Sequence, residues 1–401
     1  MSLVITNIGE LTTQDREHTV LRNAAVVFEG ERISWIGAAA DAPAADDMID
    51  AQGRAGLPGW VDSHTHLVFA GDRTAEFEAR MAGQDYAAGG IAVTTDATRT
   101  TSDYDLTRLL LGRVAEANAG GTTYLETKTG YGLDVEHEGR SARIAAGVVD
   151  EVTYLGAHLI PAGIDPDQYV RLVCGPMLDA VRPYVSWADV FCERGAFSAE
   201  QSREILTACR DAGLGLRVHG NQLGPGAGVQ LAVEFGAASV DHVNYLDEAD
   251  IAALADSWSG YDDGTGPRGT VAGCLPACDL STRQPLAPGR ALLDAGVQIA
   301  LASNCNPGTS YTTSMAYCVT TAVLQMGLSV HEAVRAATFG GALALHRETG
   351  TDDDGARAVG SLAVGHRADL QLLNAPSATH LAYRPGVPLT HAVWKQGNRI
   401  V

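Results

Sequence analysis

The chain has 401 residues, of which 46% are apolar and 19% charged, and its formal net charge at pH 7 is −20. This length suits one large domain with a smaller accessory domain, and the acidic balance argues against nucleic acid or an anionic membrane surface as a partner. No apolar run of about 18 residues or more occurs, so we expect no transmembrane helix. The seven cysteines form no paired framework, and the first residues lack a signal-peptide pattern, so we expect a cytoplasmic protein.

Both ends of the chain contain short runs rich in β-branched and aromatic residues, separated by turn residues such as Gly and Asn. These runs cover residues 2–6, 24–28, 32–36, 368–373 and 391–394. They predict one small β-sandwich domain built from both termini, comprising residues 1–58 and 357–401.

Between them, over residues 59–356, β-like runs alternate with helical runs. The expected strands include 122–127, 215–219, 238–242, 270–275 and 298–302, and the expected helices include 102–119, 199–212, 229–235, 248–256 and 330–345. Such alternation predicts a parallel sheet, and eight repeats over this length would make a (β/α)8 TIM barrel. The alternation alone does not distinguish a closed barrel from an open sheet.

Polar residues follow several of the apolar runs, where a barrel places its functional groups. His64 and His66 come first, and side chains two apart on a strand share one face, so both imidazoles can reach one ion. Two histidines at this spacing, taken alone, are more often ordinary polar residues at the end of a strand. Further polar residues at predicted strand ends strengthen the metal hypothesis, namely His158, His219, His242 and Asn304. Three imidazoles with one oxygen ligand suit one divalent metal ion, zinc or iron.

Several longer stretches carry a family resemblance. They are HTHLVFAGDRTAEFEAR at 64–80, ETKTGYGLDVEHE at 126–138, FCERGAFS at 191–198, VHGNQL at 218–223 and NCNPGTS at 304–310. Through them the chain resembles the amidohydrolase superfamily. Within it, the chain is similar to the branch that opens the ring of 4-imidazolone-5-propanoate to N-formimino-L-glutamate in histidine degradation, by attack of metal-activated water on the cyclic amide.

The resemblance implies roles for particular positions, and it implies a homodimer. The implied metal ligands are His64, His66, His219 and Asn304, and the implied substrate contacts are Arg73, Tyr131, His158, Gln222, Asn306, Gly308 and Thr309. The guanidinium of Arg73 could hold the propionate carboxylate through two parallel hydrogen bonds. Gly308 would let the backbone approach the ligand closely.

The chain departs from the family pattern at Asn304 and Gln222, where the pattern has acidic residues. Amides keep the shape of carboxylates but lose their charge and basicity. Asn304 and Gln222 keep catalytic positions in this interpretation, but neither can accept a proton from water. His242, at the end of its strand, is then the best remaining proton acceptor. Two alternatives stay open: a related heterocycle deaminase, and a metal-poor relative that only binds ligand.

Overall fold

The computed structural model describes residues 1–83, 90–261, 265–350 and 357–401. Internal packing divides the chain into two compact units, one formed by residues 1–63, 115–124 and 314–401 and the other by residues 64–114 and 125–313. The predicted domain boundaries, after residue 58 and before residue 357, stay a prediction. Residue 356, on the second boundary, lies outside the described residues.

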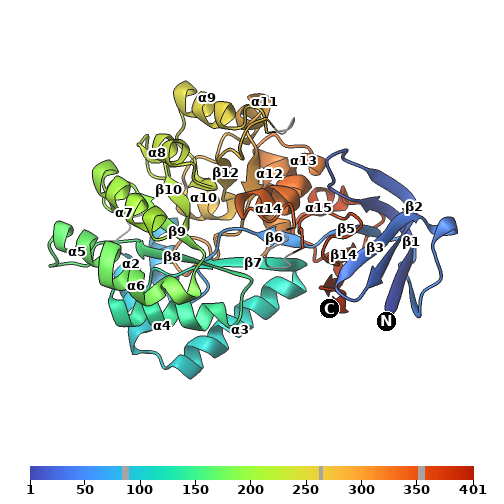
Figure 1. Cartoon of the computed structure of the whole chain (residues 1–401), viewed down its shortest axis with the longest axis horizontal. Helices are drawn as coiled ribbons and strands as arrows, with labels where there is room; N and C mark the ends of the chain where they lie inside the picture. Colours follow the sequence, from blue (N-terminus) through green and yellow to red (C-terminus); the bar gives the residue numbers. More distant parts are fainter. Residues whose placement is uncertain (84–89, 262–264, 351–356) are drawn as a thin grey trace. The chain divides into compact units, whose positions relative to one another are not determined.

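The first unit contains a sheet made from both ends of the chain. Its strands are β1 (Ser2–Thr12), β2 (Val20–Glu29), β3 (Arg32–Ala38), β4 (Asp47–Asp50), β5 (Ala55–Pro58), β14 (Leu370–Leu373), β15 (Thr390–Lys395) and β16 (Asn398–Arg399). The order is β16-β15-β14-β5-β1-β2-β3, with β4 paired to β1, so that C-terminal strand β14 lies beside N-terminal β5 (Figure 1). Ile5, Phe28 and Trp394 pack into one buried cluster of this sheet. The predicted β domain built from both termini is thereby confirmed.

The second sheet follows the chain order from β6 to β13. Its strands are β6 (Trp60–Asp62), β7 (Thr122–Lys128), β8 (Glu151–Ala157), β9 (Trp187–Cys192), β10 (Gly215–Gly220), β11 (Ser239–His242), β12 (Val271–Cys274) and β13 (Ile299–Leu301). The pairings from β7 to β13 are parallel. This succession is that of a (β/α)8 barrel.

Backbone hydrogen bonds at residues 64–66 close this sheet. The Lys128 N–H donates to the carbonyl of Thr65 at 2.8 Å on one side. On the other side, the Asn304 N–H donates to the carbonyl of His64 at 3.0 Å. Segment 64–66 therefore joins the end of β7 to the segment that follows β13. The predicted TIM barrel is confirmed, and the open sheet is excluded.

Helices connect the strands. Those up to β13 are α1 (Thr74–Met81), α2 (Ile91–Thr100), α3 (Asp103–Ala119), α4 (Val135–Ala146), α5 (Pro166–Leu172), α6 (Leu178–Val181), α7 (Ala199–Asp211), α8 (Gly228–Phe235), α9 (Glu248–Ser257), α10 (Pro276–Thr282) and α11 (Gly289–Asp294). Later come α12 (Met315–Gln325), α13 (Val330–Arg335), α14 (Gly341–Ala344) and α15 (His380–Tyr383). Short 3-10 helices occupy Ala39–Asp41 and Arg182–Tyr184, and π-helical turns occupy Val173–Met177 and Ala336–Gly340. Figure 1 shows α4, α7, α8 and α9 around the outside of strands β8 to β11.

Local signals in the sequence explain where some helices begin. α7 starts with a capping box in which the Ser198 hydroxyl accepts the Gln201 N–H and the Gln201 side chain accepts the Ser198 N–H. Helix α8 ends at Gly236, whose φ of 61° only glycine adopts at low cost. Among the described residues, no helix is both long and apolar enough to cross a membrane.

The capping box gives a test of this local account. We expect Ser198→Ala to lower the free energy of unfolding by about 1 kcal/mol, because the hydroxyl that accepts the Gln201 N–H at the start of α7 is lost. Urea unfolding followed by circular dichroism measures the change. Gln201→Glu keeps both bonds and serves as the control. An unchanged unfolding midpoint in Ser198→Ala would show that the cap contributes nothing to stability.

Candidate metal centre and active site

Histidines from separate strand ends converge at one end of the barrel. His64 and His66 follow β6, and His219 lies near the end of β10. The ring centroid of His219 is 4.5 Å from that of His64 and 5.5 Å from that of His66. His242, the last residue of β11, offers a ring nitrogen within 4.8 Å of nitrogens of His64 and His219. His64, His219 and His242 are therefore close enough to share one ion. The predicted ligand His66 lies beside this group, with its ring centroid 5.3 Å from that of His64, but its nitrogens are not part of it.

A buried carboxylate lies behind each of two of these rings. The Nδ1 of His64 is 2.8 Å from Asp241 Oδ2, and the Nδ1 of His219 is 3.0 Å from Asp189 Oδ2. Such partners fix the ring orientation and keep the proton on Nδ1, so that Nε2 presents its lone pair. Burial holds the pKa of His64 well below its usual range, which keeps the imidazole neutral, as metal ligation requires.

Lys128 is fully buried beneath the same histidines. Its Nζ is 3.1 Å from Glu126 Oε1 and 2.9 Å from Asp189 Oδ2. Burial acts to raise the pKa of Asp189, but the neighbouring His219 ring and the Lys128 ammonium outweigh it and hold that pKa well below its usual range. Asp189 is thus an anion facing His219.

Sequence reasoning did not find Asp189. The available signal was an acidic residue inside the apolar run of β9, WADVFC. Charged residues are almost never fully buried unless they are paired, so this position could have been singled out.

The histidine cluster fits a divalent ion. His64 Nε2 and His66 Nδ1 are buried, and neither has a hydrogen-bond partner in the described part of the chain. An unsatisfied buried polar atom is costly, and a cation would take up such a lone pair. Neutral imidazole nitrogens suit zinc or iron(II).

Asn304 and Gln222 line the pocket, but protein contacts already engage their amides. The Asn304 Oδ1 accepts a hydrogen bond from Asn306 Nδ2 at 3.2 Å. The Gln222 Nε2 lies 3.8 Å from Cys278 Sγ. Asn304 has φ of 50°, a left-handed conformation in which Asn and Asp are both enriched. The backbone at this position therefore tolerates a carboxylate as well as an amide.

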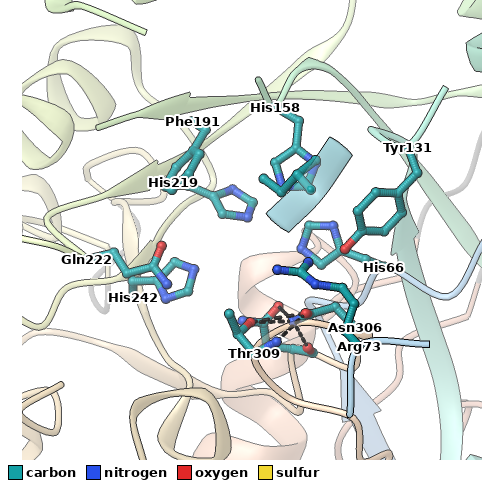
Figure 2. Close-up of a pocket in the computed structure, with 12 residues that line it drawn as sticks. His66, Arg73, Tyr131, His158, Phe191, His219, Gln222, His242, Asn306 and Thr309 are labelled. Carbon is teal, nitrogen blue, oxygen red and sulfur yellow. Dashed lines mark hydrogen bonds between the residues drawn. The ribbon is translucent and has the colours of Figure 1, made fainter. Parts of the chain in front are cut away.

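These residues line a small, partly open pocket. Its lining consists of His66, Arg73, Ile91, Tyr131, His158, Phe191, His219, Gln222, His242, Asn304, Asn306 and Thr309 (Figure 2). Of the predicted substrate contacts, all but Gly308 appear in this lining. A pocket lined by so many polar groups suits a small polar ligand.

Arg73 is buried beside the pocket and held by an acidic partner. Its Nε and Nη2 donate to the two carboxylate oxygens of Glu76 at 2.9 and 2.7 Å. A side chain at Gly308 would meet the Arg73 guanidinium, so glycine there lets the arginine keep its place. Asn306 shapes the same loop, because its Oδ1 accepts the N–H groups of Gly308 and Thr309 at 2.9 and 2.8 Å.

The loop that carries Tyr131 is held by buried polar groups. The Glu138 carboxylate accepts N–H groups from Gly130, Gly132 and Leu133, at 2.6 to 3.1 Å. His158 Nδ1 donates to the Gly130 carbonyl at 2.9 Å. Burial lowers the pKa of His158 to about 4, so this ring is neutral at pH 7.

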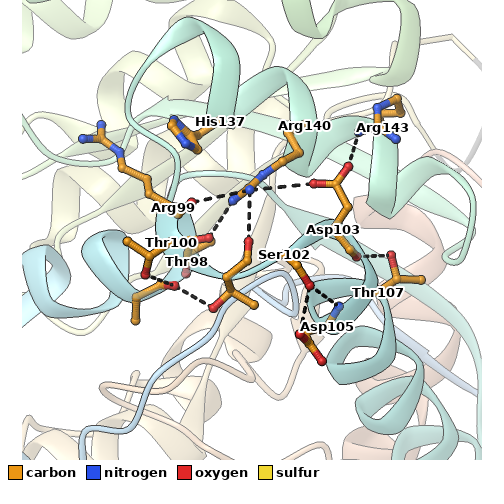
Figure 3. A network of polar contacts seen from close by, with 12 residues as sticks. Thr98, Arg99, Thr100, Ser102, Asp103, Asp105, Thr107, His137, Arg140 and Arg143 are labelled. Carbon is orange, nitrogen blue, oxygen red and sulfur yellow. Dashed lines mark hydrogen bonds and ion pairs between the residues drawn. The ribbon is translucent and has the colours of Figure 1, made fainter.

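A second set of bonds joins α2 to this loop and to α4. Arg99 Nε donates to the Gly132 carbonyl at 2.6 Å, and Arg140 on α4 donates to the carbonyls of Thr98 and Thr101 at 2.6 and 3.1 Å (Figure 3). Together these contacts hold one wall of the pocket in place without a ligand.

His242 is buried, and its Nδ1 has no hydrogen-bond partner among the described residues. Burial holds its pKa well below the usual value, so the ring is neutral. Its φ of 84° is a rarely adopted conformation for a residue with a side chain, and such strain is frequent at functional sites.

The sequence profile of the amidohydrolase family matches residues 192–400. Solved structures share the fold. The model is similar to a triazine hydrolase from Arthobacter aurescens, with a TM-score of 0.74, 18% identity and coverage of 100% of this chain and 94% of that one. It is also similar to an adenosine deaminase from Xanthomonas campestris with bound zinc, with a TM-score of 0.71, 19% identity and coverage of 99% and 92%. A metal-binding barrel with this profile match defines a protein of the amidohydrolase class.

Curated relatives are much more similar in sequence. The imidazolonepropionase of Arthrobacter sp. (strain FB24) is 80% identical over 399 residues, covering 100% of both chains. That of Mycolicibacterium smegmatis is 55% identical over 403 residues, covering 99% of this chain and 97% of the relative. The chain therefore belongs to the imidazolonepropionases of the amidohydrolase family.

The carboxylates behind the histidines give a second test. We expect Asp241→Asn to weaken metal binding about 10- to 100-fold, because the amide lacks the negative charge that orients the His64 ring and raises its basicity. Competition with a chromogenic chelator measures the affinity. Asp294→Asn, at an exposed site on α11, is the control. Equal affinities of the two variants would contradict an orienting role for Asp241.

Proposed function

We propose that the chain hydrolyses 4-imidazolone-5-propanoate to N-formimino-L-glutamate. Its similarity to proteins named imidazolonepropionase and the small polar pocket with a buried arginine support this proposal. In the reaction, water adds to the ring carbonyl, the C–N bond of the cyclic amide breaks, and the released nitrogen takes up a proton.

His64, His66 and His219 would hold one divalent ion, zinc or iron, with Asn304 at the edge of its site. When bound, such an ion supplies Lewis acidity, which polarises a carbonyl and makes water a stronger nucleophile at neutral pH. The buried histidines and their carboxylate partners support this assignment.

Arg73 would anchor the propionate carboxylate. Its guanidinium is already oriented by Glu76 and packs against Gly308, which reduces the entropy lost on binding. Tyr131 and His158 would bind polar atoms of the ligand, as would Asn306 and Thr309 from the loop after β13.

His242 would accept the proton from water and return it to the departing nitrogen. Its neutral ring carries a free lone pair, and Gln222, beside it, would hold a ring substituent by hydrogen bonds without taking a proton. The homodimer and the cytoplasmic location stay predictions, which size measurement in solution and cell fractionation would test.

The anchoring role of Arg73 makes a specific prediction. We expect Arg73→Ala to raise KM for imidazolone propionate by about 100-fold, since a charge-assisted bidentate contact is lost. Arg73→Lys keeps the charge without the planar fork, so we expect partial rescue. Steady-state kinetics measure both, with Arg290→Ala on exposed α11 as the control. An unchanged KM in Arg73→Ala would overturn the proposed substrate.

The amide at position 304 leads to a further prediction. We expect Asn304→Asp to strengthen zinc binding about tenfold or more, because an anionic ligand attracts a cation that neutral groups only partly satisfy. Chelator competition measures the affinity. Asn398→Asp adds the same charge in the exposed strand β16 and is the control. Equal affinity in Asn304→Asp and the parent would place residue 304 outside the metal site.

A further inference from the structure

A second buried arginine on α1 lies close to the one that lines the pocket. Arg73, Glu76 and Arg80 follow one another at spacings of three and four residues, so their side chains are neighbours along the helix. The Glu76 carboxylate accepts two hydrogen bonds from Arg73, and its Oε1 is also 3.6 Å from Arg80 Nη1. Both arginines are buried, whereas Glu76 is half-buried. None of the roles assigned above involves Arg80.

Arg80 also holds the loop that follows β13. Its Nη2 donates to the Gly308 carbonyl at 2.9 Å, and its Nε donates to the Ser281 carbonyl at 2.9 Å. The N–H of Gly308 is bound by the side chain of Asn306. The peptide groups on both sides of Gly308 are therefore fixed where this residue packs against the Arg73 guanidinium. Arg80 is not part of the pocket lining, so it acts on a ligand through these neighbours and through its charge.

The charges of the three α1 side chains determine what Arg73 can bind. An arginine paired with one carboxylate forms a neutral pair, which has little net attraction for another anion. Here two guanidinium groups share the single carboxylate of Glu76, so one positive charge is left over. Of the two arginines, Arg73 is the one that lines the pocket (Figure 2), so an anion bound there would meet this excess charge.

The geometry of Arg73 leaves room for a second carboxylate. A guanidinium has five N–H donors, and the two bonds to Glu76 use only two of them. The remaining hydrogens on Nη1 and Nη2 suit a further pair of oxygens. Gly90 and Gly308 both approach the guanidinium so closely that a side chain at either position would meet it, which leaves the arginine little freedom to turn away.

We propose that Arg80 is a positioning residue that gives the pocket its preference for a carboxylate over an uncharged group. The inference rests on the proposed function, in which Arg73 anchors the propionate. Arg80 offsets the negative charge of Glu76 and holds the backbone at Gly308. Arg73 thereby keeps both its orientation and its net attraction for an anion.

Two ligands that differ only in charge test this role. Imidazole-4-propanoate carries the carboxylate and imidazole-4-propanamide does not, and isothermal titration calorimetry on the full chain gives Kd for each. The readout is the ratio of the two Kd values, because a general loss of packing weakens both ligands alike. We expect the parent to prefer the propanoate by more than tenfold. Arg80→Gln should lower this preference about tenfold, since it removes a nearby charge in a medium of reduced dielectric constant.

Two matched variants separate charge from packing. Arg80→Lys keeps the charge, and its preference should stay within about threefold of the parent value. Arg283→Gln removes another arginine of this region, whose Nη2 donates to the Met81 carbonyl at the end of α1, and should leave the preference unchanged. The proposal is overturned if the parent binds both ligands equally, if Arg80→Gln keeps the preference, or if Arg283→Gln loses as much.

Glu76→Gln provides a second variant should Arg80→Gln fail to fold, as judged by circular dichroism. It removes the carboxylate that the arginines share, while its amide oxygen can still accept a bond from Arg73. We therefore expect the preference for the propanoate to rise about threefold or more, and a preference that falls or stays the same would contradict the charge balance. Ring opening by the parent tests the proposed function separately, because its absence beside an Arg80-dependent preference contradicts only the reaction.

Discussion

The ammonium group of Lys128 is the interaction on which the site depends most. It is buried between the carboxylates of Glu126 and Asp189. Asp189 faces His219, and Glu126 accepts the N–H of Thr65 at 3.1 Å, between the two histidines after β6. One cation thus supports ligands on two strands. Removing one member of a buried ion pair leaves an uncompensated charge, at a cost of about 3–5 kcal/mol, so these positions are linked.

Much of the fold could be predicted from local patterns, because alternating strands and helices are written in short segments of sequence. The backbone pairing that closes the barrel at residues 64–66 could not be predicted, because it involves Asn304, far away in the chain. The predicted helix 330–345 is observed as continuous helix over 330–344, with one π-helical turn at Ala336–Gly340 between α13 and α14. The glycines at 340 and 341 lower the intrinsic helix propensity of this segment, but tertiary packing can override such a preference.

The candidate site shows a similar division. The strand-end histidines could be found from periodicity, and the structure brings them together. Arg73 and Tyr131 came from the family resemblance, and no residue pattern predicted that Glu76 or Glu138 would orient them. Those contacts arise from tertiary packing. The absence of acids at 222 and 304 was visible in the sequence.

The backbone hydrogen bonds that close the barrel at residues 64–66 have a consequence for its stability. His64 and Asn304 share a backbone hydrogen bond, and His66 donates its N–H to Cys305 at 2.9 Å. Three of the residues proposed to bind the ion, His64, His66 and Asn304, therefore also lie in the segments whose backbone hydrogen bonds close the barrel. An ion held by His64, with Asn304 at the edge of its site, would add a further link between these two segments, which otherwise meet through backbone hydrogen bonds. Ion binding would then raise the free energy needed to open the barrel at residues 64–66, in addition to its chemical role.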